Sequence, residues 1–295
     1  MNEIWKEKLA DGGILIIDGA TGSELRRRGV TLSPHAWSGP ASGTHAHMLR
    51  DIHLDYVRAG ADVITTNTFG TTRFLLDAAG LDGQFEQINE RALNAALDAR
   101  KIAASDVAIA GSMSCLPPSF DTAGYPDLKT ELAAYVELAD YLADNGADLI
   151  VLEMMQETVH APLACEAARQ TGLPVWLGLS CRLDERRRCV GYDFPAIPMS
   201  ETLDALLGFK PDAVAVMHSP PVAVEPALSE LRQRWPGVVG AYPEIGGDAA
   251  FSMERWTALA RSWADMGARI LGGCCGTSPA HIRALRDMLA GAAPT

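Results

Sequence analysis

The sequence predicts an α/β protein folded as a single (β/α)8 TIM barrel. Eight short apolar runs, rich in Val, Ile and Leu, alternate with longer amphipathic stretches along the chain. The runs lack strict alternation, which is typical of parallel strands buried on both faces. An open, doubly wound sheet is less favoured, because nothing marks a reversal of strand direction. The predicted strands are residues 14–18, 63–66, 107–111, 149–153, 175–180, 213–217, 238–242 and 268–273.

A repeated transition from helix to strand supports this prediction. The segments AGADVI, NGADLI and MGARIL each place a glycine between an amphipathic stretch and an apolar run. Glycine is suited to the left-handed cap that ends a helix. The three amphipathic stretches predict helices over residues 44–59, 130–145 and 252–266. No linker or low-complexity segment interrupts the pattern, so we expect one barrel domain over residues 1–295.

The composition narrows the class of partner. The chain of 295 residues is 48% hydrophobic and carries a formal net charge of −12. We therefore expect no nucleic acid as partner, since nucleic-acid binders need a basic face. No run of about 18 apolar residues predicts a membrane span, and the charged start MNEIWKEKLADGG lacks the apolar stretch of a signal peptide. We expect a cytoplasmic protein that acts on small molecules, and the oligomeric state stays open.

The adjacent cysteines Cys274 and Cys275, in LGGCCGTSP, are the most unusual feature. Cysteines of a chain without a secretion signal are expected to stay reduced, which favours metal binding or catalysis over disulfides. Neighbouring cysteines rarely bridge each other. The pair is therefore either two small buried hydrophobic residues or two ligands of one metal ion. Cys165 is expected to pack in a helix, and the weaker candidates are Cys115, Cys181 and Cys189.

Polar residues follow the carboxyl ends of the predicted strands, the face on which barrel enzymes build their active sites. The longest connections, expected as loops, follow the first, third and fifth strands and lie on this face. His218 follows the sixth strand at the same height as Cys274 and Cys275. Because two cysteines and one histidine form a known catalytic zinc set, we predict a Zn²⁺ site from these three residues. The alternative for His218 is a hydrogen-bonded core histidine.

Two carboxylates end strands on the same predicted face. Glu153 closes the run DLIVLE, where a carboxylate needs a partner. It is interpreted as the receptor for a substrate ammonium group, with a salt bridge at the barrel rim as the alternative. Asp18 leaves the same two alternatives open. The glycines around it, Gly19 among them, predict that a ligand approaches the backbone closely.

Seven stretches together resemble the homocysteine S-methyltransferase family. They are DGATGSELRRRG, AWSGP, HLDYVRAGADVITTNTFGTT, AGSMS, DLIVLE, AYPE and GGCCGTSPAHIRAL. The resemblance extends from about Ile14 to Leu289, and GGCCGT followed by P-x-H-I is its most specific part. The resemblance implies a (β/α)8 barrel that holds one zinc ion. The zinc binds the acceptor thiol as a thiolate, and this thiolate attacks a methyl group on a cationic donor.

The resemblance also implies roles by position. Cys274 and Cys275 match the zinc-binding pair, and Glu153 matches the carboxylate that receives the amino group of homocysteine. Asp18 and Gly19 match the loop against the amino-acid substrate. We expect two further substrate-binding residues in TTNTF and AGSMS, namely Asn67 and Ser112.

A cationic methyl donor prefers aromatic faces and acidic groups. The candidate donor-binding residues are Trp37, Phe69, Tyr242 and Glu244. Two other aromatic residues on the same face, Phe120 and Tyr125, are expected to pack within their loop.

Two positions depart from the family pattern, and so does the stretch CRLDERRRCVGYD after the fifth strand. The usual Asn-Cys pair after the sixth strand is Met217-His218 here, and the usual Asn after Tyr-Pro is Glu244. Zinc with three cysteine thiolates and a substrate thiolate carries a formal charge of −2, and a neutral histidine in place of one cysteine makes it −1. A less anionic site lowers the pKa of the substrate thiol and leaves its thiolate a weaker nucleophile. We therefore expect an altered preference for acceptor or donor.

The predicted function is a zinc-dependent S-methyltransferase. It moves a methyl group from S-methylmethionine, S-adenosylmethionine or a similar sulfonium or betaine to the zinc-bound thiolate of homocysteine or a related thiol or selenol. Two alternatives stay open. The metal could activate water in a hydrolase or lyase, or the barrel could be a metal-free binding protein that has lost the methyl transfer.

Overall fold

The computed structural model describes residues 4–115, 124–246 and 251–291, and an eight-stranded parallel sheet forms its centre. The sheet order is β1-β10-β9-β8-β5-β4-β3-β2. Its two edges meet where Ile17 bridges Val63, and the amide of Asp18 donates to the carbonyl of Val63 at 3.0 Å. The predicted (β/α)8 barrel is confirmed. The eight strands are β1 (Leu15–Ile16), β2 (Val63–Thr65), β3 (Ala108–Ser114), β4 (Leu149–Met155), β5 (Val175–Leu179), β8 (Ala213–Met217), β9 (Val238–Tyr242) and β10 (Ala268–Leu271).

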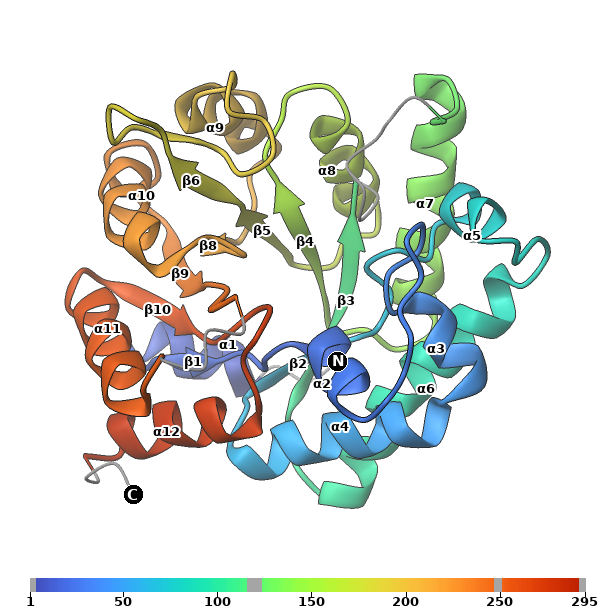
Figure 1. The fold of residues 1–295 in the computed structure, drawn as a ribbon, viewed down its shortest axis with the longest axis horizontal. Helices are drawn as coiled ribbons and strands as arrows, with labels where there is room; N and C mark the ends of the chain where they lie inside the picture. Colours follow the sequence, from blue (N-terminus) through green and yellow to red (C-terminus); the bar gives the residue numbers. More distant parts are fainter. Residues whose placement is uncertain (1–3, 116–123, 247–250, 292–295) are drawn as a thin grey trace.

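Helices surround the strands, and the chain passes once around the barrel from blue to red (Figure 1). The predicted glycines at three helix ends have positive φ angles of 103°, 113° and 94° at Gly60, Gly146 and Gly267. Within the described ranges, no helix combines the length and the apolar character that a membrane span requires. The helices are α1 (Ile4–Ala10), α2 (Thr21–Arg27), α3 (Gly39–Thr44), α4 (Ala46–Ala59), α5 (Arg73–Ala78), α6 (Phe85–Ala103), α7 (Leu128–Asp144), α8 (Ala161–Gln170), α9 (Met199–Leu206), η1 (Leu207–Phe209), α10 (Pro221–Arg234), α11 (Met253–Asp265) and α12 (Pro279–Leu289).

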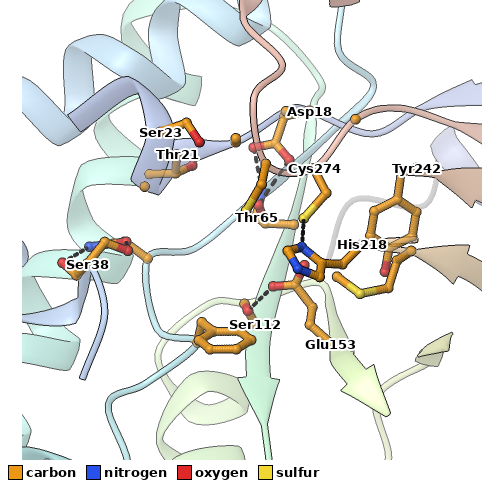
Figure 2. A pocket seen from close by; sticks show the side chains of 18 of the residues that line it. Asp18, Thr21, Ser23, Ser38, Thr65, Ser112, Glu153, His218, Tyr242 and Cys274 are labelled. Atoms are coloured by element: carbon orange, nitrogen blue, oxygen red, sulfur yellow. Dashed lines mark hydrogen bonds between the residues drawn. The ribbon is translucent and has the colours of Figure 1, made fainter. Parts of the chain in front are cut away.

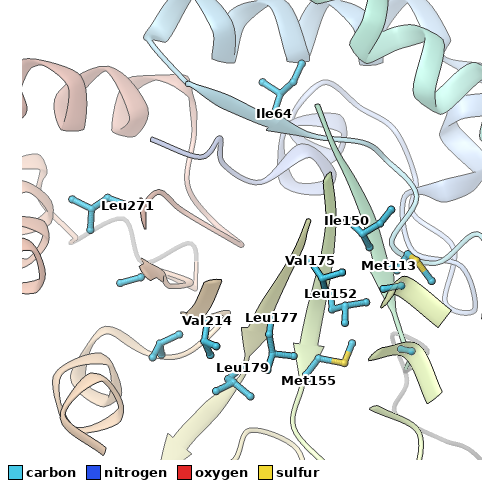
Figure 3. Packing of buried hydrophobic residues seen from close by; sticks show 14 of the residues in the cluster. Ile64, Met113, Ile150, Leu152, Met155, Val175, Leu177, Leu179, Val214 and Leu271 are labelled. Atoms are coloured by element: carbon cyan, nitrogen blue, oxygen red, sulfur yellow. The ribbon is translucent and has the colours of Figure 1, made fainter. Parts of the chain in front are cut away.

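Alternate side chains of the strands fill two separate cores. In β4, Ile150 and Leu152 belong to the cluster that packs against the helices, and Figure 3 shows them among its aliphatic side chains. Leu149 and Val151 belong to the inner cluster, because successive residues of a strand point to opposite faces. Because both faces of β4 are buried, its residues 149–152 form a continuous apolar run in the sequence.

Helix α1 closes the barrel at the amino ends of the strands. Its Trp5 is buried in the inner cluster, edge-on to Trp176 with ring centroids 5.4 Å apart. Lys8 forms a 2.8 Å salt bridge with Asp62, the residue before β2. The opposite, carboxyl ends of the strands remain available for a cavity.

Two of the connections expected as loops contain regular structure, so that expectation is corrected. After β1 the chain forms α2 and α3, the latter with proline in its first turn. After β5 it forms an antiparallel hairpin of β6 (Cys181–Leu183) and β7 (Cys189–Gly191). The side chain of Asp184 accepts hydrogen bonds from the amides of Arg186 and Arg188 and so closes the turn. Strands of three residues are too short to produce a readable alternation.

Candidate metal centre and substrate pocket

A cavity of about 240 Å³ lies at the carboxyl ends of the barrel strands. Residues that end or follow most of the strands line it, as Figure 2 shows for Asp18, Ser112 and Glu153. Eleven of the twelve residues predicted for the site line this cavity; Glu244 does not. These eleven are Asp18, Gly19, Trp37, Asn67, Phe69, Ser112, Glu153, His218, Tyr242, Cys274 and Cys275.

His218, Cys274 and Cys275 form a group of three metal-ligating side chains at one side of the cavity. Their ligand atoms all lie within 4.8 Å of one another, and His218 Nδ1 lies 3.4 Å from Cys274 Sγ (Figure 2). Tetrahedral zinc with these ligands separates its donor atoms by about 3.5 to 3.8 Å. Two thiols and an imidazole at this spacing fit a zinc ion after a small contraction. No other such group occurs in the part of the chain that the structure describes.

The backbone of His218 is left-handed, with a φ of 41° directly after β8. This conformation is energetically unfavourable for a residue with a Cβ, and such strain is frequent at functional sites. The amide of His218 donates to the carbonyl of Tyr242 at 3.3 Å. The Tyr192 ring packs against the imidazole with centroids 5.0 Å apart. The strained turn and the packed ring together hold the imidazole beside the cysteines.

Charges around the metal-ligating group favour a thiolate. Hydrogen bonding from Cys274, and then from His218, lowers the pKa of Cys275 well below its usual range despite burial. Burial acts to lower the pKa of His218, but the hydrogen bond and charge of Cys275, with Glu244, raise it overall. The hydrogen bond to Cys275 and burial raise the pKa of Cys274. The Cys274–Cys275 pair therefore releases its first proton more readily than an ordinary cysteine does.

Glu153 faces the metal-ligating group from the end of β4. Its carboxylate accepts a short hydrogen bond from the hydroxyl of Ser112 on the neighbouring strand (Figure 2). Burial raises the pKa of Glu153 to about 7, although the Ser112 hydrogen bond lowers it. The pairing of β4 with β5 shifts register between Leu152 and Met155, and Met154 has a φ of 60°. This irregularity lets both Glu153 and Met154 line the cavity, where strict alternation would turn one of them outward.

Asp18 is held rigidly at the end of β1. Its two carboxylate oxygens accept hydrogen bonds of 2.9 Å from the amide and the hydroxyl of Thr65. Burial raises the pKa of Asp18 well above its usual range, and these two hydrogen bonds oppose the shift. Beside it, a Cβ on Gly19 would lie 2.7 Å from the Thr277 hydroxyl and 2.9 Å from that of Tyr56. Only glycine fits there.

Asn67 contacts the segment after β1 that contains Trp37. Its side-chain amide donates to the carbonyl of Ser38 at 2.8 Å and to the hydroxyl of Ser42 at 3.0 Å. Its oxygen accepts from the Ser38 hydroxyl at 2.5 Å. These hydrogen bonds position the loop after β1, so Asn67 shapes the wall of the cavity.

Three of the predicted donor-binding residues line the cavity: Trp37, Phe69 and Tyr242. The hydroxyl of Tyr242 is buried without a hydrogen-bond partner in the described structure. Glu244 is half-buried outside the cavity lining, although its charge acts on His218. Tyr125 donates to the carbonyl of Cys115 at 2.8 Å, as expected of a packing residue, and Phe120 lies outside the described residues.

The remaining cysteines lie away from the cavity lining. Cys165 is buried in α8, as predicted, and Cys115 follows β3 and belongs to the outer cluster. Cys181 and Cys189 lie on the hairpin, and the amide of Cys181 donates to the hydroxyl of Ser219 at 2.9 Å. The sequence prediction missed Tyr192 and Met154. The aromatic residue at the end of the hairpin was a readable signal for Tyr192, but nothing in the pattern marks the bulge at Met154.

Fold and cavity together define a class of protein: a (β/α)8 barrel with a thiolate-rich set of metal-ligating residues at the carboxyl ends of its strands. The chain belongs to the homocysteine S-methyltransferase family, whose model matches residues 15–289.

Several proteins are similar to this chain over nearly their whole length. Homocysteine S-methyltransferase 1 of Zea mays is 25% identical, with 95% of each chain covered. Selenocysteine Se-methyltransferase of Brassica oleracea var. italica is 24% identical, with 98% of this chain and 92% of the relative covered. The homocysteine methyltransferase MmuM of Escherichia coli, solved in a metallated form, superimposes with a TM-score of 0.78 at 25% identity. That match covers 95% of this chain and 98% of MmuM.

Proposed function

We propose that this protein is a metal-dependent S-methyltransferase. It transfers a methyl group from a cationic sulfonium donor to the thiol of homocysteine or the selenol of a related amino acid. The observation that carries the proposal is the grouping of His218, Cys274 and Cys275 within 4.8 Å of one another in the cavity that also contains Glu153. Family membership supports methyl transfer over hydrolysis on the same barrel.

Zinc is the metal that this donor set suits best, because two thiolates and one imidazole leave a fourth tetrahedral position open. When bound there, zinc supplies a Lewis acid that lowers the pKa of the acceptor thiol, so that the thiol ionises near neutral pH. His218, Cys274 and Cys275 are the residues that would hold the ion.

The other polar residues orient the acceptor. Glu153 faces the metal-ligating group and can accept hydrogen bonds from the substrate ammonium group in its ionised form. Ser112 fixes the carboxylate of Glu153 by its short hydrogen bond. Asp18 is already bound to Thr65 through both oxygens, so it leaves the backbone around Gly19 to contact the amino acid.

The apolar lining favours the methyl transfer itself. A new carbon–sulfur bond forms to the thiolate while the carbon–sulfonium bond breaks, and both products are neutral thioethers. Because opposite charges cancel along the reaction, a cavity with little water favours the transition state over the separated ions. Ile17, Phe69 and Met217 supply such a lining, beside the aromatic faces of Trp37 and Tyr242 that suit a cationic donor.

The experiment is a methyl-transfer assay of the purified protein. S-Methylmethionine or S-adenosylmethionine is supplied as donor, homocysteine or selenocysteine as acceptor, and the methylated product is followed by mass spectrometry. We expect turnover that a chelator abolishes and that Cys275→Ser loses. Cys165→Ser, which changes a buried cysteine outside the cavity, should retain activity. No product with any pair of substrates, or full activity in Cys275→Ser, would contradict the proposal.

A further inference from the structure

Three consecutive arginines lie at the end of helix α2, with Arg28 as its C-cap, and Arg26 has a different kind of partner from the other two. Arg27 forms an ion pair with Glu24, and Arg28 pairs with Asp55 at 2.6 Å. The guanidinium of Arg26 lies instead over the ring of Trp37, 5.1 Å from its centroid. Among the described residues, no carboxylate pairs with Arg26. Its charge is therefore available to a ligand.

Trp37 places Arg26 at the rim of the cavity. The indole lines the cavity, and its Nε1 lies 2.5 Å from the position a Cβ would take on Gly22. The backbone of Trp37 has a φ of 49°, and its carbonyl accepts a 2.8 Å hydrogen bond from Ser33. An aromatic face holds a guanidinium less strongly than a carboxylate does, since the carboxylate forms two parallel charge-assisted hydrogen bonds. An exposed arginine held this way can turn to an anion without breaking an ion pair.

Among the described residues that line the cavity, no lysine or arginine offers its charge to a carboxylate. The ionisable lining consists of Asp18, Glu153, Tyr242, Cys274, Cys275 and His218. Five of these are acids, and His218 belongs to the metal-ligating group. The carboxylate of an amino-acid substrate therefore needs a cation from outside this lining. Arg26 compensates for this carboxylate from the rim of the cavity, where its guanidinium lies over the Trp37 ring that lines the cavity.

We propose that Arg26 binds the α-carboxylate of an amino-acid substrate at the rim of the cavity, exchanging the face of Trp37 for the carboxylate. The inference rests on the proposed function, because homocysteine and S-methylmethionine both carry this group. Arg26 is then a specificity-determining residue that selects amino acids from other thiols and sulfoniums. Arg27, one residue away and paired with Glu24, is its matched control.

The test compares Arg26→Gln, Arg26→Lys and Arg27→Gln in steady-state kinetics. Acceptors are homocysteine and 3-aminopropane-1-thiol, which lacks the carboxylate; donors are S-methylmethionine and trimethylsulfonium, which also lacks it. In Arg26→Gln we expect the KM of one amino-acid substrate to rise about tenfold with little change in kcat. The KM of its carboxylate-free analogue should stay constant. Arg26→Lys should recover part of the loss.

The pattern of the KM changes identifies the source of the carboxylate. If KM in Arg26→Gln rises for homocysteine but not for 3-aminopropane-1-thiol, Arg26 binds the carboxylate of the acceptor. If KM in Arg26→Gln rises for S-methylmethionine but not for trimethylsulfonium, Arg26 binds the carboxylate of the donor. Equal effects of Arg26→Gln and Arg27→Gln on every substrate would overturn the proposal.

A binding measurement separates this proposal from the proposed function. If the wild-type protein shows no turnover with any pair, the proposed function fails. Calorimetric titration with methionine and with its decarboxylated analogue 3-(methylthio)propylamine then tests Arg26 alone. Methionine should bind the wild type and Arg27→Gln about tenfold more tightly than Arg26→Gln, with no such difference for the amine. Equal methionine affinities, or no methionine binding by the wild type, would overturn the role of Arg26.

Discussion

His218 Nδ1 lies 3.4 Å from Cys274 Sγ, although 56 residues separate them in the chain. The barrel brings them together through the register of three neighbouring strands. Met217 pairs with Tyr242, and Leu271 pairs with Ala241, so β8 and β10 end at almost the same height on either side of β9. The residues that follow both strands therefore meet above β9.

Replacing His218 by cysteine should raise methyl transfer to homocysteine. A third thiolate makes the ligand set more anionic, so the bound acceptor keeps a higher pKa and is a stronger nucleophile. The rate constant should rise about threefold for each unit by which that pKa rises. The measurement is kcat for homocysteine in His218→Cys and wild-type protein with equal metal content. An unchanged or lower kcat would argue against the charge explanation.

The strained backbone of His218 predicts a difference between two variants that both lack the imidazole. At a φ of 41°, alanine keeps the cost of a Cβ in the left-handed region, whereas glycine does not. His218→Gly should be more stable than His218→Ala by up to about 1 kcal/mol. Urea denaturation of the two metal-free proteins measures this difference. Equal free energies of unfolding would show that the turn after β8 stores no such strain.

Glu153 should make the stability of the metal-free protein depend on pH. Burial raises its pKa from 4.5 to about 7, so the folded state binds a proton that the unfolded state releases between these values. The stabilisation is complete below pH 4.5 and is lost as the pH rises through 7. Glu153→Gln should therefore be more stable than the wild type at pH 8, by at most about 3 kcal/mol, and equally stable near pH 4.5.

Chemical denaturation across this pH range, with a chelator present, provides the measurement. Ser112→Ala removes the hydrogen bond that lowers the pKa of Glu153, so its loss of stability should continue to a higher pH and be larger in total than that of the wild type. A Glu153→Gln protein whose stability differs from the wild type by the same amount at every pH would refute this account.

Asn67 should be intolerant of even an isosteric change. In Asn67→Asp, the group that donates to the Ser38 carbonyl and the Ser42 hydroxyl becomes an acceptor. The free energy of unfolding should fall by about 2 to 3 kcal/mol, because buried polar atoms lose their partners. The same substitution at Asn94, which is exposed on α6, should cost less than about 0.5 kcal/mol. Equal small losses at both positions would mean that Asn67 does not hold the loop.

The sequence predicted the barrel well because the barrel depends on features that a single chain displays. Each strand is buried on both faces, so runs such as 149–152 are continuously apolar. Residues at or directly after the predicted strand ends, such as Glu153 and His218, could be assigned to one face from topology alone. The His-Cys-Cys grouping followed from that assignment.

Other features depend on backbone geometry that side-chain patterns do not encode. Met154 enters the cavity only because β4 changes register, and a left-handed φ at a methionine or histidine has no sequence signature. The contact of Tyr192 with His218 requires the hairpin after β5, whose strands of three residues are too short to predict. Glu244 was expected in the cavity from its position after β9, but it is absent from the lining.

The most direct test of the central claim is the metal content of the protein as purified without added metal. Wild type, His218→Ala and Cys275→Ser are measured together by inductively coupled plasma mass spectrometry, with Cys165→Ser as the control. We predict about one zinc ion per chain in the wild type and the control, and a marked loss in the two other variants. No zinc in the wild type, or undiminished zinc in His218→Ala and Cys275→Ser, would contradict a metal centre built from His218, Cys274 and Cys275.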